Sequence, residues 1–443
     1  MRILLNLKLY NNINILTDDP AIINEANLWG KECIFNYSSI PMRIFDTPFA
    51  TISLLYGPRQ VGKTSSLKLY LSQVQDSETL IYTDCSVMLD KKDLYEHLSS
   101  SIQGRSTIVL DEVQSVHDWH LALRTLYSEG KLSQSRIWCT GSEARYLLES
   151  GERLPGRKGE GKNIFLRPWN FREFVDFFYP HLATPYQGLH FHHLNQNWLN
   201  DQKINWEKPW NEYLKTGGIP QVVGYYKQKG HIPDHVWHVY RDWILGTWSK
   251  VRTPERSLMA VSKRLITTMN SRIDYEVLKK GTDIQSANTV KTLIDMQEDH
   301  FSIRTLPKFD IHKKEFVPSK QKKMYPLDPF VAQIFASIGF NVRRTFDESL
   351  PQMKLDECAF LAQTLRYADD IQASYLYSQT SKAEIDFHFD NCCFELKSQG
   401  LPSKKQGELL KMCPQNFVIQ KDKLPLMAYL VAEKRYLGET NVS

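Results

Sequence analysis

A short stretch of the sequence combines the residue types that bind the phosphates of a nucleotide. The segment ATISLLYGPRQVGKTSSLKLYLSQV passes from an apolar, β-rich run through a glycine-bounded loop into residues with helical spacing. Its pattern is G-x-x-x-x-G-K-[ST], in which glycines let the backbone approach phosphate oxygens while the helix N-terminus and the lysine supply positive charge. Thr64 would hold Mg²⁺ through its hydroxyl. We therefore expect ATP to contact Gly57, Pro58, Arg59, Gln60, Val61, Gly62, Lys63, Thr64 and Ser65.

Hydrolysis also needs a second metal contact and a group that activates water, and two carboxylates are suitably placed. In STIVLDEVQSVHDW a buried strand, Ile108 to Leu110, is followed by Asp111 and Glu112. Asp111 would contact Mg²⁺ through water, and Glu112 would polarise the attacking water. The alternative is a pair of solvated carboxylates at a strand end. Their position, about fifty residues after the phosphate loop and directly after an apolar strand, favours catalysis.

Two further residues are candidates for sensing or completing the nucleotide site. The strand SRIWCTGSEARYL ends in a Thr-Gly-Ser triplet. If this strand lies between the phosphate-loop strand and the Asp-Glu strand, Ser142 sits near the γ-phosphate, although such triplets also form ordinary turns. Arg157, in the glycine-rich loop LPGRKGEGK, is either a surface charge or an arginine finger. A finger that reaches a neighbouring subunit's phosphate would require a homo-oligomer.

The segment EIDFHFDNCCFELKSQ near the C-terminus places charged residues among apolar ones in a predicted β-hairpin. If Asp390-Asn391 is a two-residue turn, Asp386 lies directly opposite Glu395. Opposed carboxylates repel one another, and a divalent cation would relieve that repulsion. Lys397 beside them would stabilise the attacking water or a pentavalent phosphate. The three charged residues share one strand face, and the other face carries Ile385, Phe387, Phe389, Phe394 and Leu396.

Between these segments the sequence indicates a helix-turn-helix. Tyr275 to Lys280 is one short helix, Gly281 is the turn, and a second helix runs from Ser286 to about Asp299 with Ser286 as N-cap. A predicted strand pair then forms a basic wing with Lys313, Lys314, Lys320, Lys322 and Lys323.

This winged helix has two interpretations. Asn288 and Lys291 would face DNA on a reading helix, with the wing on phosphates. Alternatively the module is a rigid lid, since Asp295, Glu298 and Asp299 weaken any basic face.

Length and composition set broad limits on the protein class. A chain of 443 residues with 42% hydrophobic residues is globular and long enough for two to four domains. A net charge of +5 permits nucleic acid as a partner without requiring it. The 7 scattered cysteines fit reduced thiols, with neither a disulfide framework nor a zinc site. Because no uninterrupted apolar run approaches a membrane span, we expect a cytoplasmic protein that does not associate with membranes.

Six segments resemble, in order, the signatures of a family of prokaryotic AAA+ type ATPases: LLYGPRQVGKTS, IVLDEVQSVHDW, TGSEARYLLES, LPGR, RPWNFREFV and YLKTGGIPQVV. The resemblance covers roughly residues 50 to 400. It implies an additional-strand ATPase core in which Lys63, Thr64, Asp111 and Glu112 have the roles given above. It also implies a winged helix and a C-terminal restriction-endonuclease-like domain.

That superfamily uses a D…ExK arrangement to hold one or two Mg²⁺ ions for phosphodiester hydrolysis. The resemblance assigns these positions to Asp386, Glu395 and Lys397, with Ile385 where the superfamily nominally has proline. Such folds often add a metal-binding carboxylate from the preceding helix, which here is Glu357 in KLDECAFLAQTLRYA. Glu357 is equally explained as a first-turn glutamate favoured by the helix dipole.

The predicted fold class is thus α/β, with a helical lid and a winged helix between two α/β domains. We expect an N-terminal segment without an assigned role (1–45), an AAA+ P-loop core (46–180), an insertion and helical lid (181–255), a winged helix (256–335) and a restriction-endonuclease-like domain (336–443). The predicted function is Mg²⁺-dependent ATP hydrolysis coupled to action on nucleic acid through the C-terminal domain. The alternative is an ATP-driven switch whose winged helix and C-terminal domain bind DNA or protein without cleaving.

Overall fold

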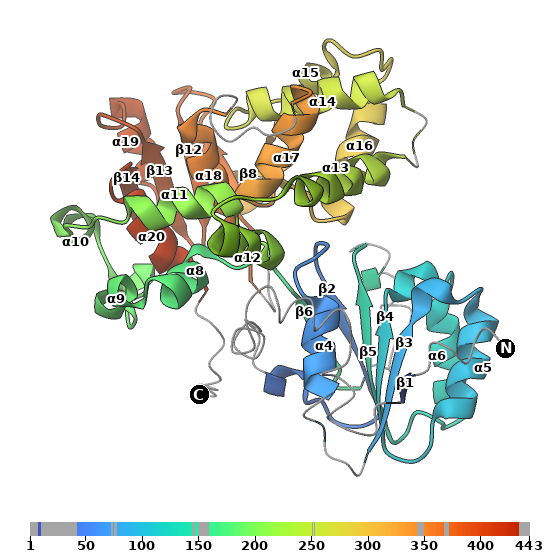
Figure 1. The fold of residues 1–443 in the computed structure, drawn as a ribbon. Coiled ribbons are helices and arrows are strands. Elements are labelled where there is room, and N and C mark those ends of the chain that lie inside the picture. The colour runs from blue at the N-terminus through green and yellow to red at the C-terminus, as the bar shows by residue number, and fades with distance from the viewer. Residues whose placement is uncertain are drawn as a thin grey trace. The chain divides into compact units, whose positions relative to one another are not determined.

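The computed structural model describes residues 8–9, 42–71, 74, 78–143, 147–148, 159–249, 251, 253–342, 350–366 and 372–433. The chain divides into two compact units, which we describe separately (Figure 1). Unit 1 is Met1–Arg167 with Asp299–Phe301 and Arg435–Ser443, and unit 2 is Pro168–Glu298 with Ser302–Lys434. Most of the segment 1–45 and the candidate finger Arg157 lie outside the described residues. Within the described chain, no helix combines the length and apolar character needed to cross a membrane.

Unit 1 contains a six-stranded sheet in the order β1-β3-β4-β5-β2-β6. Strand β1 (Lys8–Leu9) is antiparallel to β3, and the other neighbours are parallel. The remaining strands are β2 (Thr51–Tyr56), β3 (Thr79–Asp84), β4 (Ser106–Asp111), β5 (Ser135–Gly141) and β6 (Asn163–Phe165). Strand β5 therefore lies between the phosphate-loop strand β2 and the Asp-Glu strand β4, which is the condition placed on Ser142.

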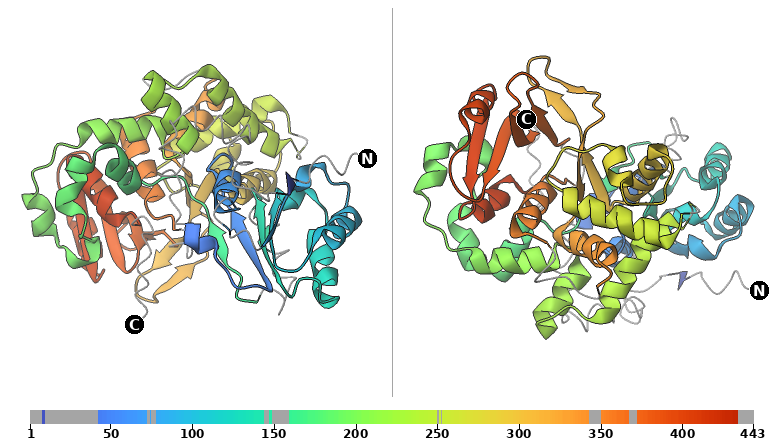
Figure 2. Two further views of the ribbon diagram at one scale, coloured as in Figure 1. Left: turned by 60° about the horizontal axis from the view of Figure 1, so that its bottom comes forward. Right: turned by 90° about the horizontal axis from the view of Figure 1, so that it is seen from above.

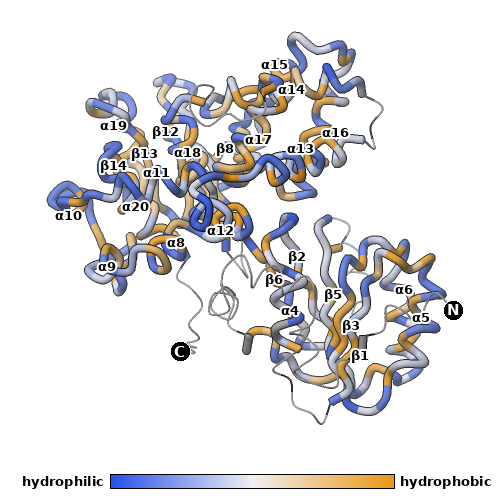
Figure 3. Tube along the Cα trace, viewed as in Figure 1, coloured by the Kyte–Doolittle hydropathy of each residue, from blue (hydrophilic) through white to orange (hydrophobic). Residues whose placement is uncertain are grey.

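Figure 3 shows hydrophobic stretches in β3. The residues of β2, β3 and β4 are buried along most of each strand, as expected where helical elements cover both faces of a parallel sheet. On one face, alternate residues such as Leu54, Ile108 and Ile137 pack against helices α5 (Lys91–Ser101) and α6 (Trp119–Ser128). On the other face, Trp138 meets the 3₁₀ helix η2 (Met42–Phe45). The parallel strands are therefore buried on both sides.

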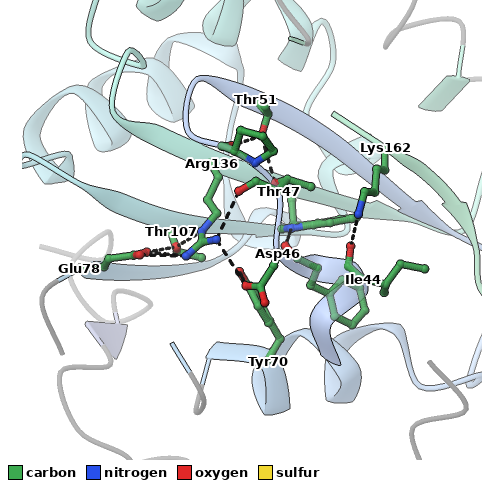
Figure 4. A network of polar contacts seen from close by, with 12 residues as sticks. Ile44, Asp46, Thr47, Thr51, Tyr70, Glu78, Thr107, Arg136 and Lys162 are labelled. Carbon is green, nitrogen blue, oxygen red and sulfur yellow. Dashed lines mark hydrogen bonds and ion pairs between the residues drawn. The ribbon is translucent and has the colours of Figure 1, made fainter. Parts of the chain in front are cut away.

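A polar network holds the amino-terminal ends of β4 and β5 together. Arg136 Nη2 lies 2.9 Å from Glu78 Oε1, and Arg136 Nε donates to Thr107 Oγ1 at 2.8 Å. The Arg136 and Glu78 side chains are only 11% and 8% exposed, so each charge needs the other. Figure 4 shows Arg136 reaching from β5 toward Glu78, Thr107 and Asp46. This network lies at the end of the strands remote from Asp111, where it fastens the sheet without entering the candidate site.

Unit 2 begins with helices and contains a second sheet. The helices are α8 (Phe171–Phe178), α9 (Pro180–Ala183), α10 (Gln196–Asp201), α11 (Glu207–Thr216), α12 (Pro220–Lys229), α13 (Asp234–Trp248), α14 (Glu255–Thr268), α15 (Tyr275–Lys279), α16 (Ala287–Asp299), α17 (Pro329–Gly339), α18 (Gln352–Ala362), α19 (Lys404–Leu410) and α20 (Leu424–Val431). The predicted helices of the helix-turn-helix correspond to α15 and α16. Ser286 Oγ accepts the Asn288 N–H at 3.1 Å, which agrees with the predicted N-cap.

The Gly-Gly pair of the TGGIP motif explains how three distant segments of unit 2 interlock. The Trp169 N–H donates to Gly218 O at 2.8 Å, and the Gly218 N–H donates to Asp328 Oδ2 at 2.6 Å. A Cβ on Gly218 would lie 1.7 Å from Trp169 O, and one on Gly217 would lie 2.0 Å from Asp328 Oδ1. Only glycine fits both positions. Asp328 also caps α17 by accepting the Phe330 N–H at 2.8 Å.

The second six-stranded sheet has the order β14-β13-β12-β11-β8-β9. Its strands are β8 (Lys308–Asp310), β9 (Glu315–Val317), β11 (Ser374–Tyr377), β12 (Glu384–Phe389), β13 (Cys392–Lys397) and β14 (Gln415–Gln420). Its later strands appear in red and orange (Figure 2). Leu409 and Leu410 of α19 pack on one face, and Phe360 of α18 packs on the other.

Two expectations require revision here. The strand pair β7 (Ile303–Leu306) and β10 (Lys323–Pro326) is present, but β8 and β9 join the C-terminal sheet through β11, so they are not a free basic wing. The structure also joins Cys393 and Cys413 in a disulfide, where the sequence indicated reduced thiols. Helix α19 brings Cys413 back beside β13, a proximity that the cysteine spacing does not reveal. The expected cytoplasmic location stays a prediction.

We predict that Gly218→Ala destabilises unit 2 by roughly 2–4 kcal/mol, because its methyl group would displace the Trp169 backbone. Thermal unfolding followed by tryptophan fluorescence measures this loss. Gly246→Ala is the matched control, since no atom lies within 4 Å of the added Cβ and the position is inside α13. That control should be neutral or stabilising by up to about 1 kcal/mol. Equal midpoints for Gly218→Ala and the wild type would contradict the interlock.

Candidate nucleotide site and C-terminal charge cluster

The phosphate loop connects the end of β2 to the first residue of α4 (Lys63–Leu71). Gly57 and Gly62 have φ of 153° and 94°, which a residue with a side chain rarely adopts. A Cβ on Gly57 would lie 2.2 Å from Leu166 O, so the loop is pressed against the chain that follows β6. The glycines of the motif are thus required by conformation and by space.

Lys63 lies folded back within this loop. Its Nζ donates to Gly57 O at 3.1 Å and to Pro58 O at 2.9 Å. Burial lowers the pKa of Lys63, an effect that Glu112 and Asp111 oppose. A buried ammonium held by neutral carbonyl oxygens gains a stronger partner when an anionic phosphate enters the loop.

Asp111, at the carboxyl end of β4, accepts hydrogen bonds from three neighbouring elements. Thr64 Oγ1 of α4 donates to Asp111 Oδ2 at 2.8 Å, and Tyr82 of β3 donates to the same oxygen at 2.7 Å. Thr140 of β5 donates to Oδ1. The carboxylate is 5% exposed and is therefore fixed in place by three hydroxyl groups.

The Thr64 hydroxyl and the Asp111 carboxylate fit a Mg²⁺ ion. Both are hard oxygen donors, and Mg²⁺ in nucleotide sites takes few protein ligands because water and phosphate oxygens supply the rest. Their direct contact puts both groups on one small volume beside the phosphate loop. No further carboxylate is needed there.

Glu112 follows Asp111 in a left-handed backbone conformation, with φ of 51°. Its N–H donates to Thr140 Oγ1 at 3.0 Å, and its carboxylate accepts from Gln114 Nε2. Ser142 Oγ lies 3.5 Å from Glu112 Oε2 and 3.4 Å from Gln114 Nε2. The structure thus brings the predicted base and the predicted sensor together.

Gln114 and Tyr82 contribute to this site although the motif analysis did not select them. Gln114 Oε1 is buried without a hydrogen-bond partner among the described residues, and a Cβ on Gly141 would lie 2.3 Å from it. The available signal for Gln114 was its position two residues after Glu112 in LDEVQ. Tyr82 gave no such signal, because its contact depends on the pairing of β3 with β4.

In the C-terminal hairpin the predicted register is confirmed near the turn and changes before Asp386. The pairs Phe389↔Cys392, His388↔Cys393 and Phe387↔Phe394 form as expected. The pairing of β12 with β11 then shifts by a residue. The Asp386 N–H donates to Glu395 Oε2 at 3.3 Å, and the Leu396 N–H donates to Asp386 Oδ2 at 3.0 Å.

This irregularity overturns the predicted division of faces. Ile385 packs with Cys393 and with Leu409 of α19, whereas Phe387 packs against Phe360 of α18 at a ring distance of 5.6 Å. Ile385 and Phe387 were expected on one face. The side-chain period of two is broken by the bulge between them.

Four acids lie near this irregularity, and two of them share one partner. Lys323 Nζ lies 2.8 Å from Glu384 Oε1 and 3.1 Å from Asp386 Oδ1. Glu357 Oε2 accepts from Tyr325 at 2.8 Å. Within the described parts of the chain no three His, Cys, Asp or Glu side chains gather as metal ligands. The predicted metal set of Glu357, Asp386 and Glu395 is therefore not assembled.

Lys397 contacts the predicted acid of the ExK motif. Its Nζ lies 2.7 Å from Glu395 Oε1, and Gln406 Nε2 of α19 donates to the same oxygen at 2.6 Å. Glu395 is 3% exposed. Burial and the charge of Asp386 raise the pKa of Glu395 to about 7, and Lys397 acts in the opposite direction.

The predicted DNA-binding lysines fall into two groups. Lys313, Lys314 and Lys320 are exposed. Lys291 is exposed and pairs with Asp295 at 2.5 Å, and its contact with DNA stays a prediction. Lys323 is fully buried and does not match its predicted role on phosphate.

Comparisons with known proteins support the P-loop fold of unit 1. A family model described as AAA domain matches residues 50–175. An uncharacterized protein of Methanocaldococcus jannaschii is 26% identical over 178 residues, which are 39% of this chain and 36% of that protein. The chain thus matches little more than a third of that relative's length.

Two solved structures illustrate the structural similarities. The Orc1 protein of Aeropyrum pernix in complex with DNA has 11% identity and a TM-score of 0.33, over 75% of this chain and 92% of that one. AMPPCP-bound DnaA of Aquifex aeolicus has 13% identity and a TM-score of 0.26, over 61% and 85%. The family-model match, the parallel sheet and the phosphate loop together support an α/β P-loop NTPase core in residues 50–175.

Proposed function

We propose that unit 1 binds ATP and hydrolyses it with Mg²⁺. The contact between Thr64 Oγ1 and Asp111 Oδ2 at 2.8 Å carries this proposal, because it joins the phosphate loop to the acidic end of β4. A glycine loop without a ligand would not require this contact, and burying the Lys63 ammonium there costs free energy. Phosphoryl transfer depends mainly on positioning and on stabilising charge, and both kinds of group are present.

Each residue then has a defined task. Lys63 leaves the carbonyl oxygens of its own loop and donates to phosphate oxygens. Thr64 and, through water, Asp111 would hold Mg²⁺, which would supply positive charge for the transferred phosphoryl group. Glu112 orients the attacking water and accepts its proton, while Ser142 reports on the γ-phosphate.

We predict that Lys63→Ala weakens nucleotide binding or turnover by roughly 100-fold, because a preorganised donor to phosphate is lost. Fluorescent-nucleotide titration and phosphate release measure the two quantities. Lys92→Ala, which removes a surface lysine whose side chain is 79% exposed, should leave both unchanged. Unaltered binding and turnover in Lys63→Ala would refute the assignment of the loop.

Glu112→Gln is expected to retain ATP binding and to lower kcat by about 10²- to 10⁴-fold, because the amide cannot accept a proton. The protein should then hold ATP unhydrolysed, which chromatography of the bound nucleotide detects. Steady-state turnover at the wild-type rate would remove Glu112 from the mechanism.

A third variant tests how Glu112 is positioned. Gln114→Ala should lower kcat about 10-fold or more with little change in KM, because Glu112 loses its amide donor while the phosphate loop is intact. Gln134→Ala, an exposed glutamine before β5, is the matched control. A change confined to KM would argue against a positioning role.

We propose that the C-terminal unit binds DNA or protein and does not cleave nucleic acid. The specific observation is that Asp386 and Glu384 share a buried lysine, and that the described residues hold no group of three or more acids, histidines or cysteines for the metal ions that phosphodiester hydrolysis uses. ATP turnover would then act on a C-terminal unit that binds DNA or protein.

Purified protein should therefore leave labelled single- and double-stranded DNA and RNA intact with Mg²⁺ or Mn²⁺, whether or not ATP is present. Lys397→Ala is the companion variant. Cleavage that disappears in Lys397→Ala would restore the nuclease interpretation, and ATPase activity measured in the same samples shows that the protein is active.

A further inference from the structure

The charge cluster around β12 has an internal cation where a nuclease-like site would hold a metal ion. Lys323 is 0% exposed, and its ammonium contacts the carboxylates of Glu384 and Asp386. Its Nζ also lies 5.9 Å from the ring centre of Phe387. A lysine is almost never fully buried unless it is paired, and this one is paired twice.

Strand β10 delivers two groups to the acids. Lys323 and Tyr325 are two residues apart on this strand, so their side chains point to the same side. Lys323 serves Glu384 and Asp386, and the Tyr325 hydroxyl donates to Glu357 Oε2 at 2.8 Å. The strand that was expected to carry a phosphate-binding lysine therefore faces the acidic cluster.

Every acid of the cluster already has a donor. Besides the groups of β10, Arg272 Nε contacts Glu384 Oε2 at 2.5 Å, and Lys397 contacts Glu395. A metal ion bound at Asp386 Oδ1 would compete with the Lys323 ammonium, which lies 3.1 Å from that oxygen. Two cations that share one carboxylate repel each other.

Electrostatics agree with this geometry. Burial opposes the charge on Lys323, yet Asp386, Glu357 and Glu384 outweigh it and raise the pKa of Lys323 well above its ordinary value. Burial and Asp386 raise the pKa of Glu357 to about 8, while Lys323 acts in the opposite direction. The contacts of Lys323 Nζ with Glu384 Oε1 and Asp386 Oδ1 place a cationic side chain between the two acids.

We propose that Lys323 is a tethered cation that occupies the metal position of this cluster, so that the C-terminal unit binds no divalent ion there until Lys323 is removed. The Lys323 ammonium then takes the place of a metal ion among the acids, and it lowers the affinity of the cluster for divalent ions. This inference concerns unit 2 and is independent of ATP hydrolysis in unit 1.

The test uses the full chain without nucleotide and in a Thr64→Ala background, which removes the metal contact of the phosphate loop. Mn²⁺ binding by calorimetry and thermal unfolding with EDTA or Mn²⁺ are compared for three proteins. These are the background itself, Lys323→Met, and Lys320→Met, which removes the same charge from an exposed position.

The background protein and Lys320→Met should show no stoichiometric Mn²⁺ site and the same unfolding midpoint with EDTA as with Mn²⁺. Lys323→Met should unfold at a lower temperature with EDTA, recover part of that loss with Mn²⁺, and bind Mn²⁺ at least about 10-fold more tightly. Adding Asp386→Asn to Lys323→Met should abolish the recovery.

Two results would overturn the proposal. One is a Mn²⁺ site in the background protein that is lost in Asp386→Asn, since Lys323 would then leave room for a metal ion. The other is a folded Lys323→Met that gains no Mn²⁺ affinity. If Lys323→Met does not fold even with Mn²⁺, Mn²⁺ calorimetry of the background protein and of its Asp386→Asn variant decides the question. A site that only the background protein shows overturns the proposal, and no site in either protein supports it.

Discussion

The nucleotide site depends on one carboxylate that four elements share. Asp111 is the last residue of β4 and accepts hydrogen bonds from hydroxyl groups of α4, β3 and β5. One carboxylate therefore connects the helix after the phosphate loop with three neighbouring strands. Parallel strands make this possible because their carboxyl ends meet at one edge of the sheet. The Arg136 network connects the opposite, amino-terminal ends of β4 and β5. The same strands thus carry a stabilising network at one end and the candidate site at the other.

The C-terminal unit solves a different electrostatic problem. Buried and half-buried acids lie around an irregularity in β12, and such carboxylates require compensation by cations or hydrogen-bond donors. Lys323, Tyr325 and Lys397 supply it from inside the chain. Because Lys323 and Tyr325 come from β10, which also pairs with β7 after α16, the helix-turn-helix region and the acidic cluster share a structural element. A change at β10 would therefore alter the charge balance of the cluster.

Much of the first unit followed from residue types in a fixed order. An apolar strand, a glycine loop and a helix specify a phosphate site almost by themselves, since each glycine is needed where a side chain would clash or where φ is positive. The place of β5 between β2 and β4 was stated as a condition and was met. The helices α15 and α16 were likewise predicted from a turn glycine and an N-cap serine, signals that need only local chain geometry.

What the sequence determined by itself was local: the phosphate loop, the acidic strand end, and the hairpin turn with its first cross-strand pairs. Tertiary structure decided which charges meet. A one-residue bulge between Ile385 and His388 turned Ile385 away from Phe387. A strand some sixty residues earlier brought Lys323 to the acids, and the chain after α19 brought Cys413 to Cys393. Alternation along a strand is a local rule, so it cannot foresee an inserted residue. A buried ion pair forms only where distant segments pack, and its partners are fixed by that packing and not by spacing in the sequence.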